Sequence, residues 1–166
     1  MLMLQTGAPV SQQIRAQRED RDGASVARGP AEAFAAIDTP VLVVEDFSTM
    51  VRILRNLLQR IGFADVDDAP GARIALEMLR KKRYGLLITD YNMAGMSGYE
   101  LLREVRTDPR LEMTAVLLMT ADPSVTNLVK ETEITQCLIK PFSAKMLKAK
   151  IQGLLSTNAH PLDWQS

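Results

Sequence analysis

Polar and charged side chains follow several short apolar runs, where they could meet and do chemistry. Glu45 and Asp46 follow the run Val41–Val44, and Asp90 follows Leu86–Thr89. Thr120 follows Ala115–Met119, and Lys140 follows Cys137–Ile139. In an open parallel sheet, ligands bind at the carboxyl ends of the strands. Three carboxylates at that edge would repel one another, and a divalent cation would relieve the repulsion; hard oxygen ligands favour Mg²⁺. With an ammonium and a hydroxyl beside them, they make a site for a phosphoryl group, whose charge must be neutralised during transfer.

Each of these features is weak when it stands alone. An acidic pair after a strand is usually a solvated loop, a threonine there is more often a cap, and a Lys-Pro pair is commonly a turn. Their occurrence together, in order, at consecutive strand ends is what favours a functional site.

Segments with helical periodicity lie between the apolar runs. Ser48–Ile61 places Met50, Ile53, Leu54, Leu57 and Ile61 on one face, and Gly62 is a typical stop. Ser97 and Glu100 have the spacing of a capping box. The other predicted helices are Pro70–Lys81, Ser97–Thr107, roughly Pro123–Glu133 and Ser143–Leu155, and a weaker apolar run lies near Phe63–Asp67.

This alternation predicts an α/β fold: a doubly wound parallel sheet with helices on both faces. Parallel strands need crossover connections, and helices bury both faces of such a sheet. We expect residues 39–156 to form this domain, residues 1–38 to be a flexible N-terminal extension, and residues 157–166 to be a C-terminal tail.

Composition excludes several classes of protein. The 166 residues include 20 basic and 20 acidic side chains, which gives no net charge to attract nucleic acid or an anionic membrane. Cys137 is the only cysteine, so neither an internal disulfide nor a cysteine-rich zinc site is possible. Nowhere do 18 consecutive apolar residues occur, and no signal peptide is recognisable. A cytoplasmic protein is expected, with no nucleic acid partner and no membrane insertion.

Over about residues 39–156 the chain resembles the receiver domains of bacterial two-component response regulators. Two stretches look especially like the single-domain chemotaxis regulators: VEDFSTMVRILRNLLQRIGF (Val44–Phe63) and ITDYNMAGMSGYELLREVR (Ile88–Arg106). The resemblance implies the flavodoxin-like sheet with five strands in the order 2-1-3-4-5.

The resemblance also implies roles for the residues at the strand ends. Asp90 would take a phosphoryl group from a phosphohistidine of a histidine kinase or histidine phosphotransfer protein. Glu45, Asp46, Asp90 and the backbone carbonyl of Asn92 would hold Mg²⁺. Lys140 would pair with a phosphoryl oxygen, Thr120 would hydrogen-bond another, and Asn92 and Asp122 would tune hydrolysis of the acyl phosphate.

Three departures from the family pattern concern how the site is read out. Ala94 replaces a usual proline, and Thr120 and Lys140 are two residues closer together than in the chemotaxis regulators, so the fourth helix or its flanking loop is expected to be shorter. Cys137 stands where the family has a Tyr or Phe that swings inward on activation. We interpret it as a small, partly buried residue, because no second thiol is present for a redox switch.

Partners are expected to be proteins. The single histidine, His160, lies in the tail, so the donor histidine must come from another protein, and a downstream target would bind a face containing Leu128, Cys137, Lys145 and Lys148. The basic run Arg80–Arg83 is interpreted as complementing the dipole at the end of a helix.

Two other readings remain. A phospho-independent receiver, acting only as an interaction module, would keep the acidic site as a structural remnant. A haloacid-dehalogenase-type enzyme would carry a second Asp two residues after the first, where Asn92 stands. The leading hypothesis is therefore a switch rather than an enzyme acting on an outside metabolite.

Overall fold

The computed structural model describes residues 37–132 and 134–157 as alternating strands and helices. The predicted extension and tail lie outside these residues, except for Ile37, Asp38 and the helical backbone of Thr157. The elements are β1 (Val41–Val44), α2 (Ser48–Ile61), β2 (Val66–Ala69), α3 (Ala72–Lys81), β3 (Leu86–Asp90), α4 (Gly98–Thr107), β4 (Ala115–Thr120), α5 (Val125–Leu128), β5 (Thr135–Ile139) and α6 (Ala144–Thr157).

The strands form the predicted parallel sheet, in the order β2-β1-β3-β4-β5 that the family resemblance implied. Val41 pairs with Val66 on one side and with Leu86 on the other, which places β1 between β2 and β3. Every residue of β1, β3 and β4 is buried. This is the pattern of strands covered on both faces by helices.

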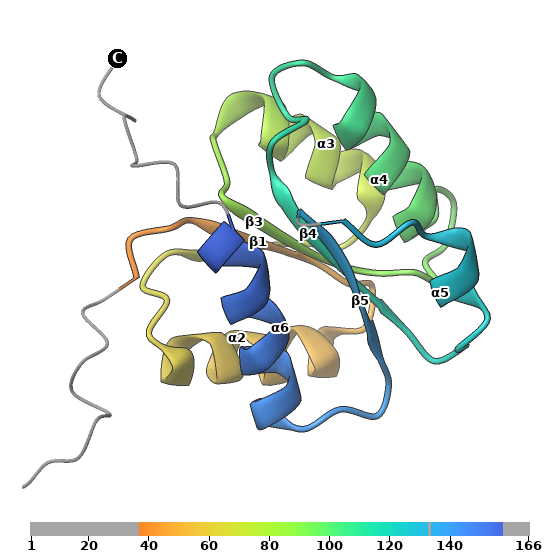
Figure 1. Cartoon of the computed structure of the whole chain (residues 1–166). Helices are drawn as coiled ribbons and strands as arrows, with labels where there is room; N and C mark the ends of the chain where they lie inside the picture. Colours follow the sequence, from red (N-terminus) through yellow and green to blue (C-terminus); the bar gives the residue numbers. More distant parts are fainter. Residues whose placement is uncertain (1–36, 133, 158–166) are drawn as a thin grey trace, which may run out of the picture. The chain divides into compact units, whose positions relative to one another are not determined.

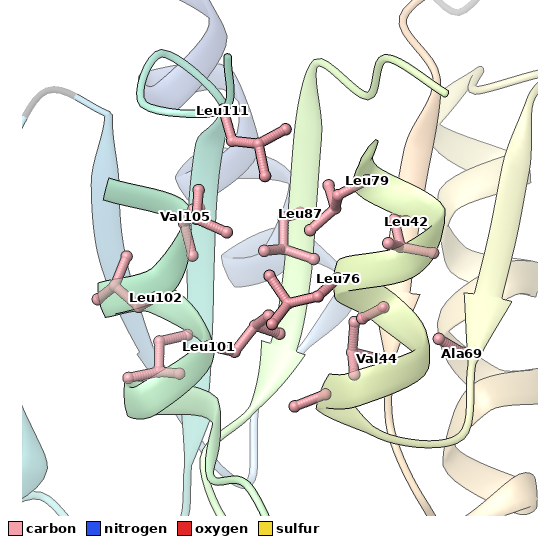
Figure 2. Close-up of a cluster of buried hydrophobic side chains, with 14 of the residues drawn as sticks. Leu42, Val44, Ala69, Leu76, Leu79, Leu87, Leu101, Leu102, Val105 and Leu111 are labelled. Carbon is pink, nitrogen blue, oxygen red and sulfur yellow. The ribbon is translucent and has the colours of Figure 1, made fainter. Parts of the chain in front are cut away.

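Helices cover the two faces of the sheet and make two separate cores. Helices α2 and α6 lie on one face, and α3, α4 and α5 lie on the other (Figure 1). Figure 2 shows the second of these layers, in which Leu76 and Leu79 of α3 and Leu101 of α4 meet Leu87 of β3. The two cores fix β1 and β3 from both sides. Glu45 and Asp46 directly follow β1, and Asp90 is the last residue of β3.

The ends of two helices follow the predicted local signals. Gly62 ends α2 with φ 120°, a conformation that side chains with a Cβ rarely adopt. Ser97 and Glu100 form the predicted capping box: the Ser97 hydroxyl accepts from the Glu100 N–H, and the Glu100 carboxylate accepts from the Ser97 N–H. Both predictions are confirmed, because caps depend on neighbours in the chain.

The predicted apolar face of α2 and the predicted second strand needed correction. Ile53 is 45% exposed, whereas Leu58, absent from the predicted face, is fully buried like Leu54. The face that packs on the sheet is thus rotated from the one predicted. The second strand is Val66–Ala69 and not Phe63–Asp67; Phe63 is buried beside α2 and only bridges to Ile37.

The predicted helix over residues 123–133 is also corrected, because α5 is a single turn, Val125–Leu128. Val129 turns to an extended conformation and is buried in the core. The segment is rich in Val and Thr, whose branched side chains lose freedom in a helix. The reduced Thr120–Lys140 spacing predicted a shorter fourth helix or a shorter flanking loop, and the helix is here a single turn.

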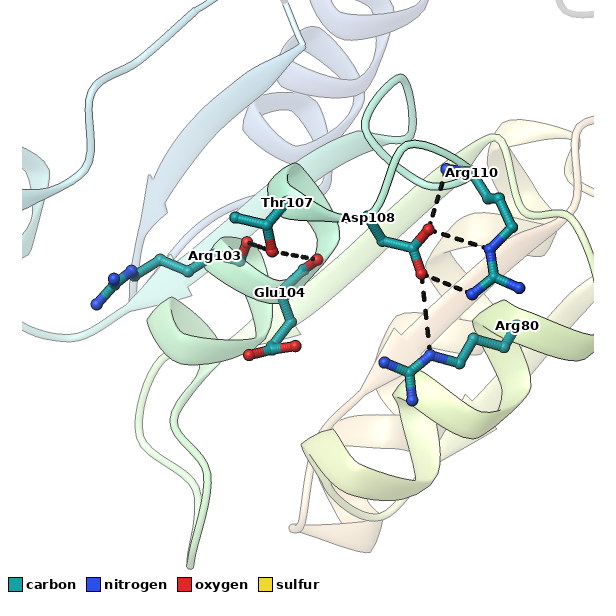
Figure 3. Close-up of polar contacts among 6 residues, drawn as sticks. All are labelled: Arg80, Arg103, Glu104, Thr107, Asp108 and Arg110. Carbon is teal, nitrogen blue, oxygen red and sulfur yellow. Dashed lines mark hydrogen bonds and ion pairs between the residues drawn. The ribbon is translucent and has the colours of Figure 1, made fainter.

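Basic residues end α3, as predicted, and one of them joins α3 to the end of α4. Arg80 and Lys81 lie in the last turn of α3, where positive charge complements the helix dipole. The carboxylate of Asp108, which follows α4, accepts from Arg110 and lies 3.9 Å from Nε of Arg80 (Figure 3). The interpretation of the run as structural is supported for these residues.

Candidate functional site

Four strand ends bring the predicted site residues to one edge of the sheet. Glu45 and Asp46 follow β1, and Asp90 is the last residue of β3. Thr120 ends β4 opposite Ile139, and Lys140 follows directly, its N–H donating to the Thr120 carbonyl at 2.7 Å. All of the strands are parallel, so these ends share one edge.

The three carboxylates form a compact group. Glu45, Asp46 and Asp90 each offer an oxygen such that the three oxygens lie within 4.8 Å of one another. Glu45 and Asp90 are buried, and Asp46 is exposed. One Glu45 oxygen accepts from the Phe47 N–H at 3.2 Å, which fixes its side chain at the start of α2.

Lys140 supplies the countercharge for the two buried acids. Its Nζ lies 2.9 Å from Oδ1 of Asp90 and 3.4 Å from Oε2 of Glu45. The ammonium thus bridges the ends of β1, β3 and β5. Three carboxylates and one ammonium leave an excess of negative charge when all are ionised.

The electrostatics of the group reflect this excess. Burial raises the pKa of the Glu45 carboxyl, and the neighbouring Asp90 raises it further, while Lys140 and the Phe47 N–H act in the opposite direction. Burial acts to lower the pKa of Lys140, but its hydrogen bond and attraction to Asp90, with Glu45, outweigh burial and raise it. Lys140 is therefore held in its charged form.

The hydroxyl of Thr120 is fully buried and bonds within its own loop. Oγ1 accepts from the Asp122 N–H at 3.0 Å, and it lies 3.4 Å from the Asp122 carbonyl oxygen. The Asp122 carboxylate in turn accepts from the Ser124 N–H at 2.8 Å. Hydrogen bonding by the Ser124 side chain, and then by this N–H, holds the pKa of Asp122 below its usual value. To reach a group bound on Asp90, the Thr120 hydroxyl would have to leave these partners.

Asn92 lies exposed two residues beyond Asp90, on the loop between β3 and α4. The assignments of its carbonyl as a metal ligand, and of Asn92 and Asp122 as residues that tune hydrolysis, stay predictions. The structure thus brings Glu45, Asp46, Asp90 and Lys140 together directly, with Thr120 on the adjacent strand end.

Cys137 is buried in the core on the side of α3 and α4, so it is more deeply buried than the small, partly buried residue that was predicted for the target-binding face. Burial, and to a smaller extent Glu131, raises the pKa of its thiol to about 11. The thiol is therefore protonated at neutral pH, in keeping with a small packed residue rather than a reactive one. Of the other residues predicted for the target-binding face, Leu128 is 60% exposed and Lys145 is exposed on α6.

Gly98 positions Asp90 and was not singled out in the sequence. A Cβ at Gly98 would lie 2.1 Å from the Asp90 carbonyl oxygen, and the Gly98 N–H donates to the Tyr91 carbonyl at 3.0 Å. The first turn of α4 therefore packs directly on the end of β3. A glycine just inside a capping box, where a better helix former is expected, was the available signal.

The donor set fits a hard divalent cation. The available ligands are the oxygens of three carboxylates, two of which are buried and share a single ammonium partner. Carboxylate oxygens together with water are the ligands that bind Mg²⁺ in proteins. A cation placed there would relieve the repulsion by Asp90 that, after burial, raises the pKa of Glu45.

Fold and site together define a doubly wound α/β protein with an acidic, lysine-bridged cluster at the carboxyl edge of its sheet. The sequence profile of the response regulator receiver domain matches residues 41–152. The chain belongs to this family. No helix in the described part of the chain is long and apolar enough to cross a membrane.

Known proteins similar to this chain include chemotaxis regulators. It is 41% identical over 116 residues to the chemotaxis protein CheY of Pseudomonas aeruginosa, which covers 69% of this chain and 94% of that protein. It is 37% identical to chemotaxis protein CheY-3 of Vibrio cholerae, covering 74% and 96%. Among solved structures, CheY4 of Vibrio cholerae has TM-score 0.64 at 29% identity, covering 71% of this chain and 99% of that one. A putative response regulator of Chloroflexus aurantiacus has TM-score 0.67 at 27% identity, covering 72% and 99%.

Proposed function

We propose that this receiver is a phosphorylation switch in which Asp90 accepts a phosphoryl group from a phosphohistidine of a histidine kinase or histidine phosphotransfer protein. The observation that carries the proposal is the buried Asp90 carboxylate, 2.9 Å from the Lys140 ammonium and grouped with two further carboxylates. In the reaction an Asp90 oxygen forms a bond to phosphorus as the phosphorus–nitrogen bond breaks, and the imidazole leaves with that electron pair.

The residues around Asp90 have complementary tasks. Glu45, Asp46, Asp90 and the Asn92 carbonyl would hold Mg²⁺, which when bound neutralises charge on the phosphoryl oxygens. Lys140, already held in its charged form, pairs with a phosphoryl oxygen. The Thr120 hydroxyl exchanges its Asp122 partner for another phosphoryl oxygen.

The consequence of phosphorylation is a change in binding to a downstream target protein. The product is a modified protein, and the only turnover is the receiver's own phosphorylation and hydrolysis. We place this activity in the cytoplasm, in a chemotaxis-like or phosphorelay system, by the resemblance to chemotaxis regulators.

The test is labelling with acetyl phosphate, with and without Mg²⁺, followed by mass spectrometry to locate the phosphate. We expect a hydroxylamine-sensitive acyl phosphate on Asp90 that requires Mg²⁺ and is absent from Asp90→Asn. Asp108→Asn, a change at a carboxylate outside the site, is the matched control and should label normally. An acid-stable phosphate on Ser or Thr, or equal labelling in EDTA, would contradict the proposal.

A phospho-independent interaction module is the alternative function. The buried Cys137, in place of a mobile aromatic, and the one-turn α5 favour it, because both alter the usual readout. A pulldown with wild type and Asp90→Asn, each with and without acetyl phosphate, separates the two functions. Identical target binding in all four samples would support the alternative.

A further inference from the structure

Strand β5, which Lys140 directly follows, lies at an edge of the sheet. One backbone N–H group on its open side donates to a side chain. Alternate N–H groups of a parallel edge strand point toward its neighbour, and the Lys140 N–H donates to Thr120 on β4. By this alternation the Cys137 N–H, three residues earlier, points away from β4. It donates instead to Oε1 of Glu131 at 2.9 Å.

Three further contacts complete this arrangement: two are made by Lys150 of α6, and one joins Thr132 to Thr135. Nζ of Lys150 lies 3.7 Å from Oε1 of Glu131 and donates to Oε1 of Gln136 at 3.2 Å. The Thr132 N–H donates to the Thr135 carbonyl at 2.8 Å. Glu131 therefore ties the segment after α5 to the middle of β5 and to α6.

The Glu131 contact is suited to reversible release. The Glu131 side chain is 43% exposed, so polar contacts rather than burial hold it in place. When its carboxylate departs, water can take its place at both donors. Breaking an exposed contact of this kind costs far less free energy than breaking a buried ion pair.

A series of short-range contacts connects this segment to the phosphorylation site. The Thr120 hydroxyl accepts from the Asp122 N–H, the Val125 N–H donates to the Asp122 carbonyl, and the Val129 N–H donates to the Val125 carbonyl. Only one residue then separates Val129 from Glu131. Only the single turn of α5 lies between the Thr120 loop and Glu131. A shift of the Thr120 loop should therefore move Glu131 as well.

We propose that Glu131 is a latch on the edge strand β5, closed in the unphosphorylated protein and released when the Thr120 hydroxyl leaves Asp122 for the phosphoryl group. The inference rests on the proposed function. The latch offers a route for output that needs no aromatic side chain at position 137. Release frees the Cys137 N–H and Lys150, and so changes the surface formed by β5 and α6.

The latch is tested by amide hydrogen exchange at Cys137 and by the rate at which a thiol reagent modifies this single cysteine. Without phosphoryl mimic, Glu131→Ala should raise exchange of the Cys137 amide by about tenfold or more, the loss expected for a hydrogen bond to a charged acceptor. Glu131→Gln keeps an acceptor oxygen and should have a smaller effect. Glu77→Ala, at an exposed glutamate of α3, is the matched control and should change neither rate.

Beryllofluoride with Mg²⁺ then mimics the phosphoryl group on the full chain. Wild type should show faster Cys137 exchange when the mimic binds, and Glu131→Ala should show no further increase. Mg²⁺-dependent binding of the mimic, seen by fluorine NMR, with unchanged Cys137 exchange would overturn the latch and leave the proposed function standing. Failure of the mimic to bind at all would overturn both. Unchanged exchange in Glu131→Ala without the mimic would show that the contact does not protect the strand.

Discussion

At the scale of single residues, the site depends on one lysine that pairs with two buried acids. Lys140 keeps its charge despite burial because Asp90 and Glu45 both lie within ion-pair distance. Removal of one partner from such a group leaves uncompensated charge in a poorly solvated place.

We therefore expect Lys140→Ala to lower the free energy of unfolding by about 1–3 kcal/mol without metal. Mg²⁺ should restore part of the loss, because the cation replaces the missing positive charge. Thermal melts with and without Mg²⁺ measure both effects, and Lys145→Ala at an exposed lysine of α6 is the control. Equal loss in the two variants would mean that the Lys140 ion pairs contribute nothing. Target binding by Lys140→Ala should also lose its dependence on phosphodonor.

Gly98 gives a second prediction at this scale. Because a Cβ would collide with the Asp90 carbonyl, Gly98→Ala should destabilise the protein by about 1–3 kcal/mol and slow labelling of Asp90. Gly153→Ala is the matched control: it lies inside α6 with open space around the new methyl, and should stabilise by about 0.5–1 kcal/mol. Denaturant unfolding of both variants decides the matter, and a stable Gly98→Ala with normal labelling would refute the close approach.

At the scale of elements, ionic contacts hold the edge strand β2 on both of its faces. Asp68 pairs with Arg55 of α2, and Asp67 accepts from Lys82 at 2.8 Å and from the Tyr84 hydroxyl at 2.6 Å. Lys82 also reaches Asp65 at 2.9 Å. Charged side chains of this kind keep an exposed edge strand from pairing with another chain.

These contacts predict how stability depends on pH. The hydrogen bond from Lys82, and then that from Tyr84, lowers the pKa of Asp67 below its usual 3.8. A carboxyl whose pKa is lowered by folding contributes stability that is present above the unfolded value and lost as pH falls through the folded value. Melting temperature should therefore fall below about pH 4, and Asp67→Asn should flatten this fall, measured by thermal melts from pH 5 to pH 2.

The flattening should be partial. Asp108 contributes in the same direction, because the side chain of Arg110 and its N–H lower the Asp108 pKa to about 2. Glu77→Gln is the control for a change of charge at an exposed position. An unchanged pH profile in Asp67→Asn would mean that the β2 contacts do not persist in solution.

Half-buried Arg106 joins elements that the sequence separates widely. Its guanidinium donates to the carbonyls of Glu112, Thr114 and Ile134 and to the Thr135 hydroxyl. Burial lowers its pKa to about 10, which still leaves it charged at neutral pH. It thereby fixes the end of α4 against the starts of β4 and β5.

At the scale of the whole molecule, the domain begins slightly before its first strand. The Ile37 N–H donates to the Gly62 carbonyl at 2.9 Å, and its side chain packs on the core beside α2 and α6. We expect a chain that starts at residue 37 to keep the melting temperature and Asp90 labelling of the full protein.

A chain that starts at residue 39 should instead lose about 1–2 kcal/mol, from one hydrogen bond and the burial of a partly covered side chain. Calorimetry of the two truncations gives the comparison. Equal melting temperatures would show that Ile37 does not support the domain, and a large loss in both would mean that the preceding residues pack on it.

The sequence by itself determined the parallel sheet, most of its helices and the polar residues gathered at its carboxyl edge. Apolar runs mark β1, β3 and β4 because strands covered on both faces must be apolar throughout. The capping box at Ser97 and the stop at Gly62 were predictable because the interacting groups are near neighbours in the chain. Glu45, Asp46, Asp90 and Lys140 were predictable because parallel strands end at one edge.

Tertiary structure alone decided the features that depend on contacts between distant segments. Periodicity predicted a helical face for α2 but left its rotation open, so Ile53 was placed inside and Leu58 was missed. Helix α5 ends at Leu128, and the extended residue that follows, Val129, is buried in the core. The bond from the Cys137 N–H to Glu131 depends on β5 lying at the sheet edge, because only there does an N–H that faces away from β4 need a partner from outside the sheet.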